Sequence, residues 1–359
     1  MLTILVAIVV LGILIFIHET GHFLTAKLFG MRVERFSLGY PPRMVGKKVG
    51  ETDYCISWIP FGGYVKIAGM VNESMDKETL SKEPQPWEFR SKSWFQKVVV
   101  VSAGSLTNIL FAFLIFFAVA LFYGIPEQVP GIFVGSVTGG KPADLLGLQS
   151  GDKIVSVEGK DVDTWDQMTQ MIYPSAGREL HITWMRNDSL FSGVITPVLD
   201  EIEVMGQKQE VGMIGIASQT EFRRRSVGFG QAVVIGGAQV VDMGRLILVS
   251  IYKLIVREES LRNLGGPVFI AKMAGESARS GFGSLVVFMA FLSLNLGILN
   301  LMPIPVLDGG HLVILNIEGL IRRPLPLKAK LAIQQVGMVL IFSLMIFAIY
   351  NDIIRFFQK

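Results

Sequence analysis

The sequence is poor in cysteine, histidine and charged residues. Cys55 is its one cysteine among 359 residues, which excludes a disulfide framework and a zinc site built from several thiolates. Only 18% of the residues are charged, and 33 basic against 30 acidic side chains give a net charge of +3. This surplus is not gathered into the basic face that nucleic-acid-binding proteins carry, so no nucleic-acid partner is expected.

Apolar side chains dominate what is present. They make up 51% of the chain, and the mean hydropathy is +0.50. Such a composition excludes a disordered chain and indicates a membrane protein rather than a wholly water-soluble one. The 38 glycines follow no three-residue period, which excludes a collagen-like structure.

Four apolar runs approach the length of about 20 residues with which a helix crosses a bilayer. They are Leu2 to Phe29, Val98 to Tyr123, Leu285 to Leu301 and Leu331 to Tyr350. The first has neither a basic start nor a small-residue cleavage site, so it favours a span over a signal peptide. A fifth segment, Gly228 to Val256, is interrupted by charged residues and is interpreted as an amphipathic helix against the membrane, with a fifth span as the alternative.

The charges of the loops predict an orientation. The connection from Met31 to Lys97 and the turn from Arg322 to Lys330 are rich in Lys and Arg, and both lie on one side of a four-span protein. Positive-inside bias makes that side cytoplasmic. The section from Pro126 to Gly283 is then extracytoplasmic. Its basic run, Arg223 to Arg225, argues weakly against this, because long translocated segments contribute little to the rule.

The section between the second and third spans contains a predicted soluble domain. Short β-branched runs such as Ile132–Val134 and Lys153–Val157 are separated by Gly, Pro and Asp turns, and Asp163 to Ile172 is predicted to be a helix. This pattern predicts an independent α+β module. The expected domains are an N-terminal membrane part (1–125), the inserted module (126–220), an amphipathic linker region (221–283) and a C-terminal membrane part (284–359).

The first span carries the stretch His18-Glu19-Thr20-Gly21-His22, a match to H-E-x-x-H. Helical residues four apart lie on one face, so both imidazoles can reach one metal ion with Glu19 beside them. Imidazole pairs suit zinc, and Glu19 can take a proton from a zinc-bound water and pass it to a leaving amine. Intramembrane ionisable groups also serve metal and proton transporters, which remain the alternative.

A third metal ligand is expected where the third span ends. Two prolines and three glycines interrupt the helix between residues 295 and 311, and membranes tolerate such a break where the backbone lines a cavity. Asp308 is the predicted third ligand, and His311 is the alternative. Asn295 and Asn300 could hold a peptide backbone or hydrogen-bond between helices.

These motifs together resemble the site-2-protease-type intramembrane zinc metalloproteases, specifically the bacterial RseP-like enzymes of regulated intramembrane proteolysis. The resemblance covers nearly the whole chain in order, from the H-E-x-x-H stretch through Phe61-Gly62-Gly63-Tyr64-Val65 and a PDZ-like module to Asn300 and Leu307-Asp308-Gly309. It implies a polytopic α-helical membrane protein of about four transmembrane helices. An inserted α+β PDZ-like domain and a membrane-associated β-hairpin complete the expected fold.

The resemblance also implies a role for each matching residue. His18, His22 and Asp308 would bind Zn²⁺, and Glu19 would be the catalytic base, in agreement with the interpretation drawn from the residues. Asn300 is implied in substrate handling. The hairpin edge is implied to bind an extended substrate by strand addition, through Phe61, Gly62, Gly63, Tyr64 and Val65. From the residues alone, these glycines predict an ordinary turn.

The implied activity is hydrolysis of a peptide bond within or near the transmembrane segment of a single-span membrane protein, such as an anti-sigma factor or a remnant signal peptide. The implied location is the bacterial cytoplasmic (inner) membrane, with the PDZ-like domain outside. Partners would be these substrates, the lipid bilayer and a peptide C-terminus at the PDZ groove. A metal or proton transporter and a non-catalytic PDZ scaffold are the other function classes.

The sequence departs from the family pattern at two places. Ser105 stands where family members typically have a proline before the asparagine that corresponds to Asn108, so a kink there is not carried over. The chain has room for one PDZ-like module, where the best-known proteobacterial members have two. This module is identified from Lys141 to Lys160, and the resemblance places its peptide-binding strand near Val211 to Ile216. That strand would bind a C-terminus, or the module would only obstruct bulky substrates.

Overall fold

The computed structural model describes residues 2–70, 83–204, 207–260 and 265–357. It separates into two compact units, one formed by Met1–Phe122 with Val227–Lys359 and the other by Tyr123–Ser226. The first unit holds the long apolar helices, and the second is the inserted domain. The range 126–220 expected for that domain lies inside the second unit.

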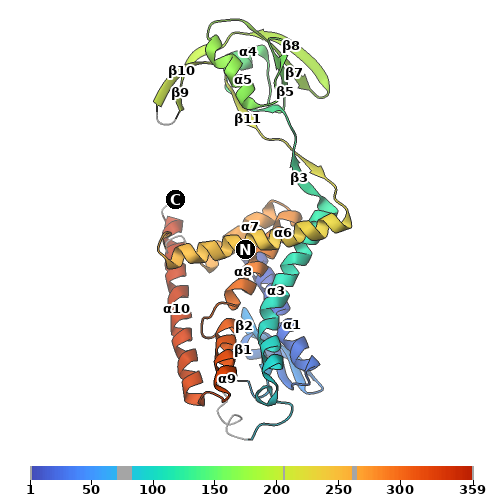
Figure 1. Cartoon of the computed structure of the whole chain (residues 1–359), viewed down its shortest axis with the longest axis vertical. Coiled ribbons are helices and arrows are strands. Elements are labelled where there is room, and N and C mark those ends of the chain that lie inside the picture. The colour runs from blue at the N-terminus through green and yellow to red at the C-terminus, as the bar shows by residue number, and fades with distance from the viewer. Residues whose placement is uncertain (1, 71–82, 205–206, 261–264, 358–359) are drawn as a thin grey trace. The chain divides into compact units, whose positions relative to one another are not determined.

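Among the described residues, seven helices carry the membrane part of the fold (Figure 1). They are α1 (Leu2–Leu28), α3 (Trp94–Tyr123), α6 (Phe229–Ile255), α7 (Pro267–Arg279), α8 (Phe282–Asn300), α9 (Asp308–Ile321) and α10 (Leu327–Phe357). The four predicted apolar runs correspond to α1, α3, α8 and α10. Among the described residues, five helices, α6 included, are long and apolar enough to cross a membrane by length and composition. The polytopic helical fold is therefore confirmed.

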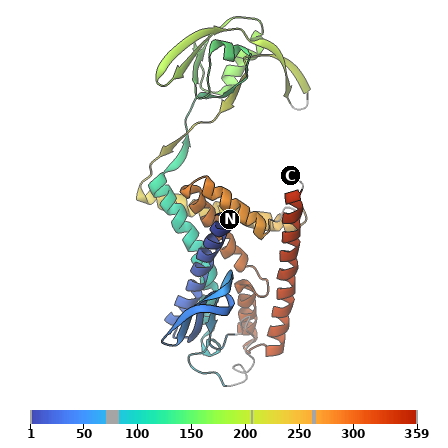
Figure 2. The same cartoon turned by 180° about the vertical axis from the view of Figure 1, so that it is seen from behind.

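Helix α6 is the segment interpreted from the sequence as amphipathic. Both views show it, together with α7, lying across the ends of α1, α3 and α8 rather than alongside them (Figures 1 and 2). A Cβ atom on Gly236 would lie 2.9 Å from the backbone nitrogen of Phe117, so α6 rests directly on the backbone of α3. Ile247 of the same face is buried, whereas Val234 is 70% exposed. This arrangement favours the amphipathic helix over a fifth span.

The four long helices run between two opposite ends of the first unit. The start of α1, the end of α3 and the last described turn of α10 lie at the end that α6 and α7 cross (Figures 1 and 2). The start of α3 and the turn between α9 and α10 lie at the other end. That turn and the first residues of α10 contain the basic stretch Arg322–Lys330. The start of α1 and the last described turn of α10 therefore lie at the same end of the unit.

A two-stranded antiparallel sheet packs beside α1 and is made of β1 (Val33–Val49) and β2 (Thr52–Ile67). Phe36 is paired both with Val65 and with Tyr54, so the early part of β1 lies between two parts of β2. The stretch from Phe61 to Val65 lies within β2. The β-hairpin implied by the resemblance is thus confirmed, and the ordinary turn predicted from the residues alone is wrong. The inner ends of both strands are buried with α1 and α3 in one apolar cluster.

The second unit is the predicted α+β domain. Its main sheet has the order β11-β4-β5-β7-β8, with β6 paired to β5. The strands are β4 (Ile132–Val137), β5 (Lys153–Val157), β6 (Lys160–Asp161), β7 (Leu180–Arg186), β8 (Ser189–Ile195) and β11 (Ile216–Gln219). Two further pairs are β9 (Val198–Val204) with β10 (Gln207–Met213), and β3 (Ile125–Gln128) with β12 (Phe222–Arg225). The predicted strands at Ile132 and Lys153 are confirmed.

Two short helices close the core of this domain, α4 (Pro142–Leu146) and α5 (Trp165–Ile172). The predicted helix from Asp163 to Ile172 begins two residues later, because Thr164 caps it: its side chain accepts a hydrogen bond from the Gln167 N–H at 3.3 Å. Met168 and Ile172 then point into a core shared with the sheet. Single 3-10 turns lie at Phe89–Ser91 and Tyr173–Ser175.

An ion pair between Arg186 and the buried Asp152 stabilises the inserted domain. Arg186 donates from Nε and Nη2 to the two carboxylate oxygens of Asp152, each at 2.7 Å, and the Asp152 side chain is 1% exposed. Burial is the largest single influence and raises the pKa of the Asp152 carboxyl. The hydrogen bonds from Arg186, the hydrogen bond from the Gln149 N–H and the charge of Arg186 together outweigh it and hold that pKa below its ordinary value of 3.8. Two parallel charge-assisted bonds of this kind are among the strong ones in proteins.

Replacing Arg186 by Leu is expected to destabilise the inserted domain by about 1–3 kcal/mol, because Asp152 then stays buried without its two donors. Since the folded-state pKa of Asp152 is lowered, the pair stabilises the domain above pH 3.8, and this contribution is lost as the pH falls through the lowered pKa. Hydrogen exchange of β5 and β7 in the intact, detergent-purified protein measures the effect. Arg178→Leu, an exposed change in the same domain, is the control. Equal exchange of wild type and Arg186→Leu at pH 7 would contradict the assignment.

Candidate metal centre and active site

The close approach of α1 and α3 positions the two motif histidines. A Cβ atom on Gly21 would lie 2.5 Å from both the Ala103 carbonyl oxygen and Thr107 Oγ1, so only glycine lets the two helices meet here. The Thr107 hydroxyl lies 2.9 and 2.8 Å from the Ala103 and Gly104 carbonyls of its own helix, and 3.2 Å from the Ile17 carbonyl across the same crossing. Small residues are the usual means by which membrane helices approach closely. His18 and His22 are thereby held against α3.

The break after α8 brings Asp308 to the same place. Helix α8 ends at Asn300, residues 301–307 are not helical, and Asp308 is the first residue of α9. A Cβ atom on Gly309 would collide with the carbonyl oxygens of Leu301 and Met302, so the first turn of α9 packs on the backbone of the break. Val306 has φ +85, a strained backbone for a β-branched residue. Such strain clusters at functional sites.

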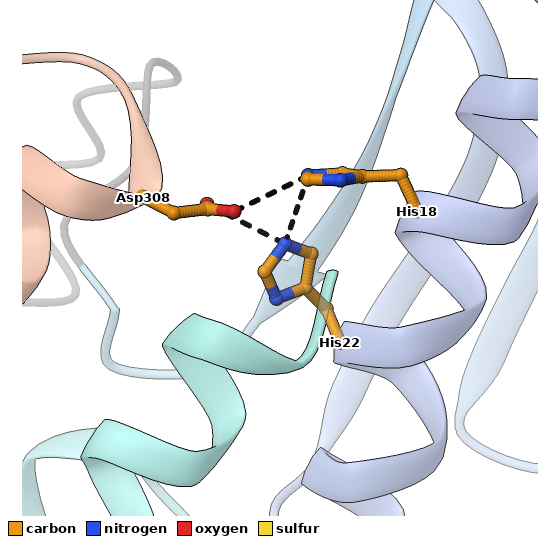
Figure 3. Close-up of side chains that lie close together, drawn as sticks. All are labelled: His18, His22 and Asp308. Atoms are coloured by element: carbon orange, nitrogen blue, oxygen red, sulfur yellow. Dashed lines mark hydrogen bonds and ion pairs between the residues drawn. The ribbon is translucent and has the colours of Figure 1, made fainter. Parts of the chain in front are cut away.

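Three ligand atoms converge at this point (Figure 3). His18 Nε2 lies 3.2 Å from His22 Nε2 and 3.4 Å from Asp308 Oδ2, and His22 Nε2 lies 3.5 Å from Asp308 Oδ1. Zinc bonds of about 2.0–2.1 Å in a tetrahedral arrangement place ligand atoms about 3.3–3.4 Å apart. The spacing of these atoms therefore fits one zinc ion, and the donor set of two imidazoles and one carboxylate is one that zinc uses.

The hydrogen bonds behind the histidines leave their inner nitrogens available. His22 Nδ1 lies 2.8 Å from the Val100 carbonyl oxygen, which can only accept, so Nδ1 carries the hydrogen and Nε2 the lone pair. His18 Nδ1 lies 3.3 Å from the Asn108 amide nitrogen. The Asn108 Oδ1 atom is buried and has no hydrogen-bond partner among the described residues.

A half-turn of the Asn108 amide would bring its oxygen to His18 Nδ1. Its oxygen then accepts from His18 Nδ1–H, which leaves the lone pair of His18 on Nε2. The two lone pairs of His18 and His22 then face each other across 3.2 Å. Two nitrogen lone pairs at this distance repel each other unless a cation lies between them. The hydrogen bonds around the two histidines therefore also fit a bound metal ion.

A cavity of about 660 Å³ opens beside the three ligand atoms. The predicted residues Glu19, Asn300, Gly62, Gly63, Tyr64 and Val65 all line it together with His18, His22 and Asp308. Phe61 lies in β2 with them, but its side chain is outside the described part of the structure. A Cβ atom on Gly63 would lie 2.8 Å from Ile15 Cγ2 and 3.3 Å from Glu19 Cγ, so β2 contacts α1 directly at Glu19.

The two asparagines of α8 differ in what they face. The Asn300 amide nitrogen lies 3.5 Å from His18 Nε2, at the cavity. The Asn295 amide nitrogen donates to the Phe291 carbonyl of its own helix at 3.4 Å. The sequence left both roles open for both residues, and the structure places only Asn300 beside the ligand atoms. His311 lines the cavity but does not belong to the close group of three, which contains Asp308 instead.

The sequence interpretation missed what α3 contributes to the site. The Val100 carbonyl holds His22, and Ser105 Oγ donates to Asp308 Oδ2 at 2.9 Å. A backbone carbonyl leaves no signal in a sequence. Ser105 did give a signal in the sequence, because it replaces a proline that is typical of the family. Tyr40, which lines the cavity and stacks on Tyr64 with ring centroids 6.3 Å apart, was also missed.

Comparison with known proteins places these observations in one family. Residues 6–344 match peptidase family M50. A relative from Rickettsia conorii, named as a zinc metalloprotease, is 35% identical over 369 residues that cover 100% of both chains. A relative of the same kind from Clostridium perfringens is 32% identical over 352 residues, 98% of each chain, and one from Mesorhizobium japonicum is 33% identical over 355 residues, 96% of each chain.

Two solved PDZ domains resemble part of this chain. The PDZ domain of an SdrC-like protein from Listeria monocytogenes is 22% identical and covers 26% of this chain and 93% of its own, with a TM-score of 0.20. The corresponding domain from Listeria innocua is 20% identical, covers 26% of this chain and 99% of its own, and has a TM-score of 0.21.

The ligand set predicts the metal content of the purified protein. Wild type purified in mild detergent without chelator should hold about one zinc ion per chain, and His22→Ala and Asp308→Ala should lose most of it, because two ligands alone bind zinc weakly. Elemental mass spectrometry on matched, folded samples measures this. His311→Ala is the control, since His311 lines the cavity without joining the ligand group. Loss of zinc from His311→Ala with retention in Asp308→Ala would reverse the choice of third ligand.

Proposed function

Because the chain belongs to peptidase family M50, we propose that it hydrolyses a peptide bond within or near the transmembrane segment of single-span membrane proteins. The protein is a zinc metalloprotease with several membrane-crossing helices. The observation that carries the proposal is the cavity in which His18, His22 and Asp308 meet Glu19 and the wall formed by β2. Membership in a peptidase family favours hydrolysis over the transporter and scaffold alternatives.

Each residue of the cavity has a chemical task in this proposal. His18, His22 and Asp308 would hold a zinc ion, which would supply a Lewis acid to the scissile carbonyl and to the attacking water. The Glu19 carboxylate accepts the proton released from the attacking water and delivers it to the nitrogen of the leaving amine. The Asn300 amide donates a hydrogen bond to the oxygen of the scissile carbonyl as negative charge develops there.

Strand β2 is proposed to hold the substrate in an extended form. The amides of an intact transmembrane helix are bonded within the helix, so a scissile bond becomes accessible only after local unwinding. Gly62, Gly63 and Tyr64 form the cavity wall next to Glu19 with backbone in the extended conformation. An unwound segment that lies along this wall would exchange its helical hydrogen bonds for those of a strand.

The membrane orientation follows from the two ends of the first unit. The end with Arg322, Arg323, Lys328 and Lys330 is proposed to face the cytoplasm, in keeping with positive-inside bias. The chain enters and leaves the inserted domain at the other end, through the end of α3 and the start of α6. The inserted domain is then extracytoplasmic, and the membrane is the bacterial inner membrane.

Substrates of this class include an anti-sigma factor already shortened on its outer side and remnant signal peptides. The inserted domain is proposed to act on the same substrates from outside the membrane. It would bind a C-terminus near Val211 to Ile216, where β10 ends and β11 begins, or obstruct substrates with bulky outer parts.

Replacing Glu19 by Gln should abolish cleavage while zinc is retained. The amide cannot accept the proton, and loss of general acid–base catalysis lowers rates by about 10²–10⁴-fold. Cleavage of a single-span model substrate in detergent or liposomes and zinc content are measured on the same sample. Glu276→Gln on α7, an identical change away from the cavity, is the control. Unchanged cleavage by a zinc-loaded Glu19→Gln protein would refute the proposed mechanism.

The two asparagines of α8 offer a matched test of substrate handling. Asn300→Ala should lower kcat/KM by about 100-fold, because it removes a donor aimed at developing charge. Asn295→Ala removes a donor that serves only its own helix and should leave kcat/KM unchanged. Zinc content should be the same in both proteins. Equal losses of kcat/KM in the two variants would show that Asn300 acts only between helices.

A further inference from the structure

Ser105 is the residue of the site that the family resemblance does not account for. It lies on α3, is 0% exposed, and donates its hydroxyl hydrogen to Asp308 Oδ2 at 2.9 Å. An ionised carboxylate can only accept, so the direction of this bond is fixed. We propose that Ser105 is a positioning residue that orients the Asp308 carboxylate for metal binding.

The contrast with a neighbouring serine on the same helix supports this role. Serine in a helix commonly bonds to the carbonyl one turn back. Ser102 does so, since its hydroxyl donates to the Val98 carbonyl at 2.8 Å and also lies 3.3 Å from that of Val99. Ser105 directs its hydroxyl across to another element, although the two residues belong to one continuous helix.

The position of the Ser105 hydroxyl is fixed by close helix contacts on two sides. A Cβ atom on Gly297 of α8 would lie 2.8 Å from the Ser105 carbonyl oxygen, so α8 packs directly on this turn of α3. On the other side, Gly21 of α1 packs on the carbonyl of Ala103. A donor held this rigidly selects one rotamer of the carboxylate that accepts from it.

With Ser105, helix α3 provides a hydrogen-bond partner for each of the three proposed metal ligands. The Val100 carbonyl holds His22, the Asn108 amide holds His18, and Ser105 holds Asp308. Asp308 follows a non-helical segment directly, so its carboxylate needs a partner outside its own element to keep one orientation. Proline, which the resembled family has at this position, carries no hydroxyl and could not supply this bond.

The test measures metal binding rather than cleavage, and it rests on the proposed function only through the ligand role of Asp308. Full-length protein in detergent is stripped of metal and titrated with Co²⁺, whose visible d–d bands report ligand geometry. Ser105→Ala should weaken Co²⁺ binding by about 10–100-fold and change the d–d spectrum, because a ligating carboxylate loses its hydrogen-bond partner. Chelator competition gives the corresponding affinity for zinc.

Two further variants make the result specific. Ser102→Ala is the same substitution on the same helix and should bind Co²⁺ as wild type does. Ser105→Thr keeps the hydroxyl donor and should restore part of the affinity. Wild-type affinity and an unchanged spectrum in Ser105→Ala would overturn the role of Ser105. Failure of wild type to take up Co²⁺ would instead overturn the ligand set itself, so the two failures are distinguishable.

Discussion

The contact on which the site depends is the crossing of α1 and α3 at Gly21. A side chain there would collide with the Ala103 carbonyl and the Thr107 hydroxyl, and any greater separation of the helices would move both histidines away from the groups that orient them. Gly104 repeats the constraint from the other helix, because a Cβ atom on it would lie 2.8 Å from His18 Nε2 and would fill the space beside both rings. The metal site thus exists because two glycines let two helix backbones approach.

Polar groups within apolar surroundings need partners, and this requirement explains much of the architecture around the site. An unsatisfied polar group costs several kcal/mol in hydrocarbon. The histidines, Asp308 and Asn108 are therefore gathered into one connected group rather than spread along the helices. The non-helical segment 301–307 is tolerated because it packs on α9 through Gly309 and lines a cavity. The same packing of helices thus forms the cavity and supplies its polar side chains with partners.

The sequence predicted those parts of the protein whose signals are local. The apolar runs, the helical spacing of His18 and His22 and the helix that ends at Ile172 each lie within one element, and each was located to within a few residues. That Asp308 lies close to His18 and His22 was inferred only from the break in the third span. No local pattern of residues shows which parts of the chain come together in the fold. The contribution of α3 was missed because Val100 acts through its backbone and Ser105 acts on a residue far away in the sequence. Strand β2 was predicted only through the family resemblance, because two adjacent glycines, Gly62 and Gly63, are a sequence pattern typical of a turn.

The distribution of the ligands over the chain has a consequence for stability as well as for catalysis. His18 and His22 belong to the N-terminal part and Asp308 to the C-terminal part, and the inserted domain separates the two in sequence. An ion held by all three side chains would therefore link α1 to α9 across α3. Because a site of this kind does not exist in an unfolded chain, the free energy of metal binding adds to the stability of the assembled helices. The hydrogen bonds that α3 provides lower the conformational freedom that the ligands lose on binding. They hold the three side chains close to the arrangement that the ion requires before it arrives.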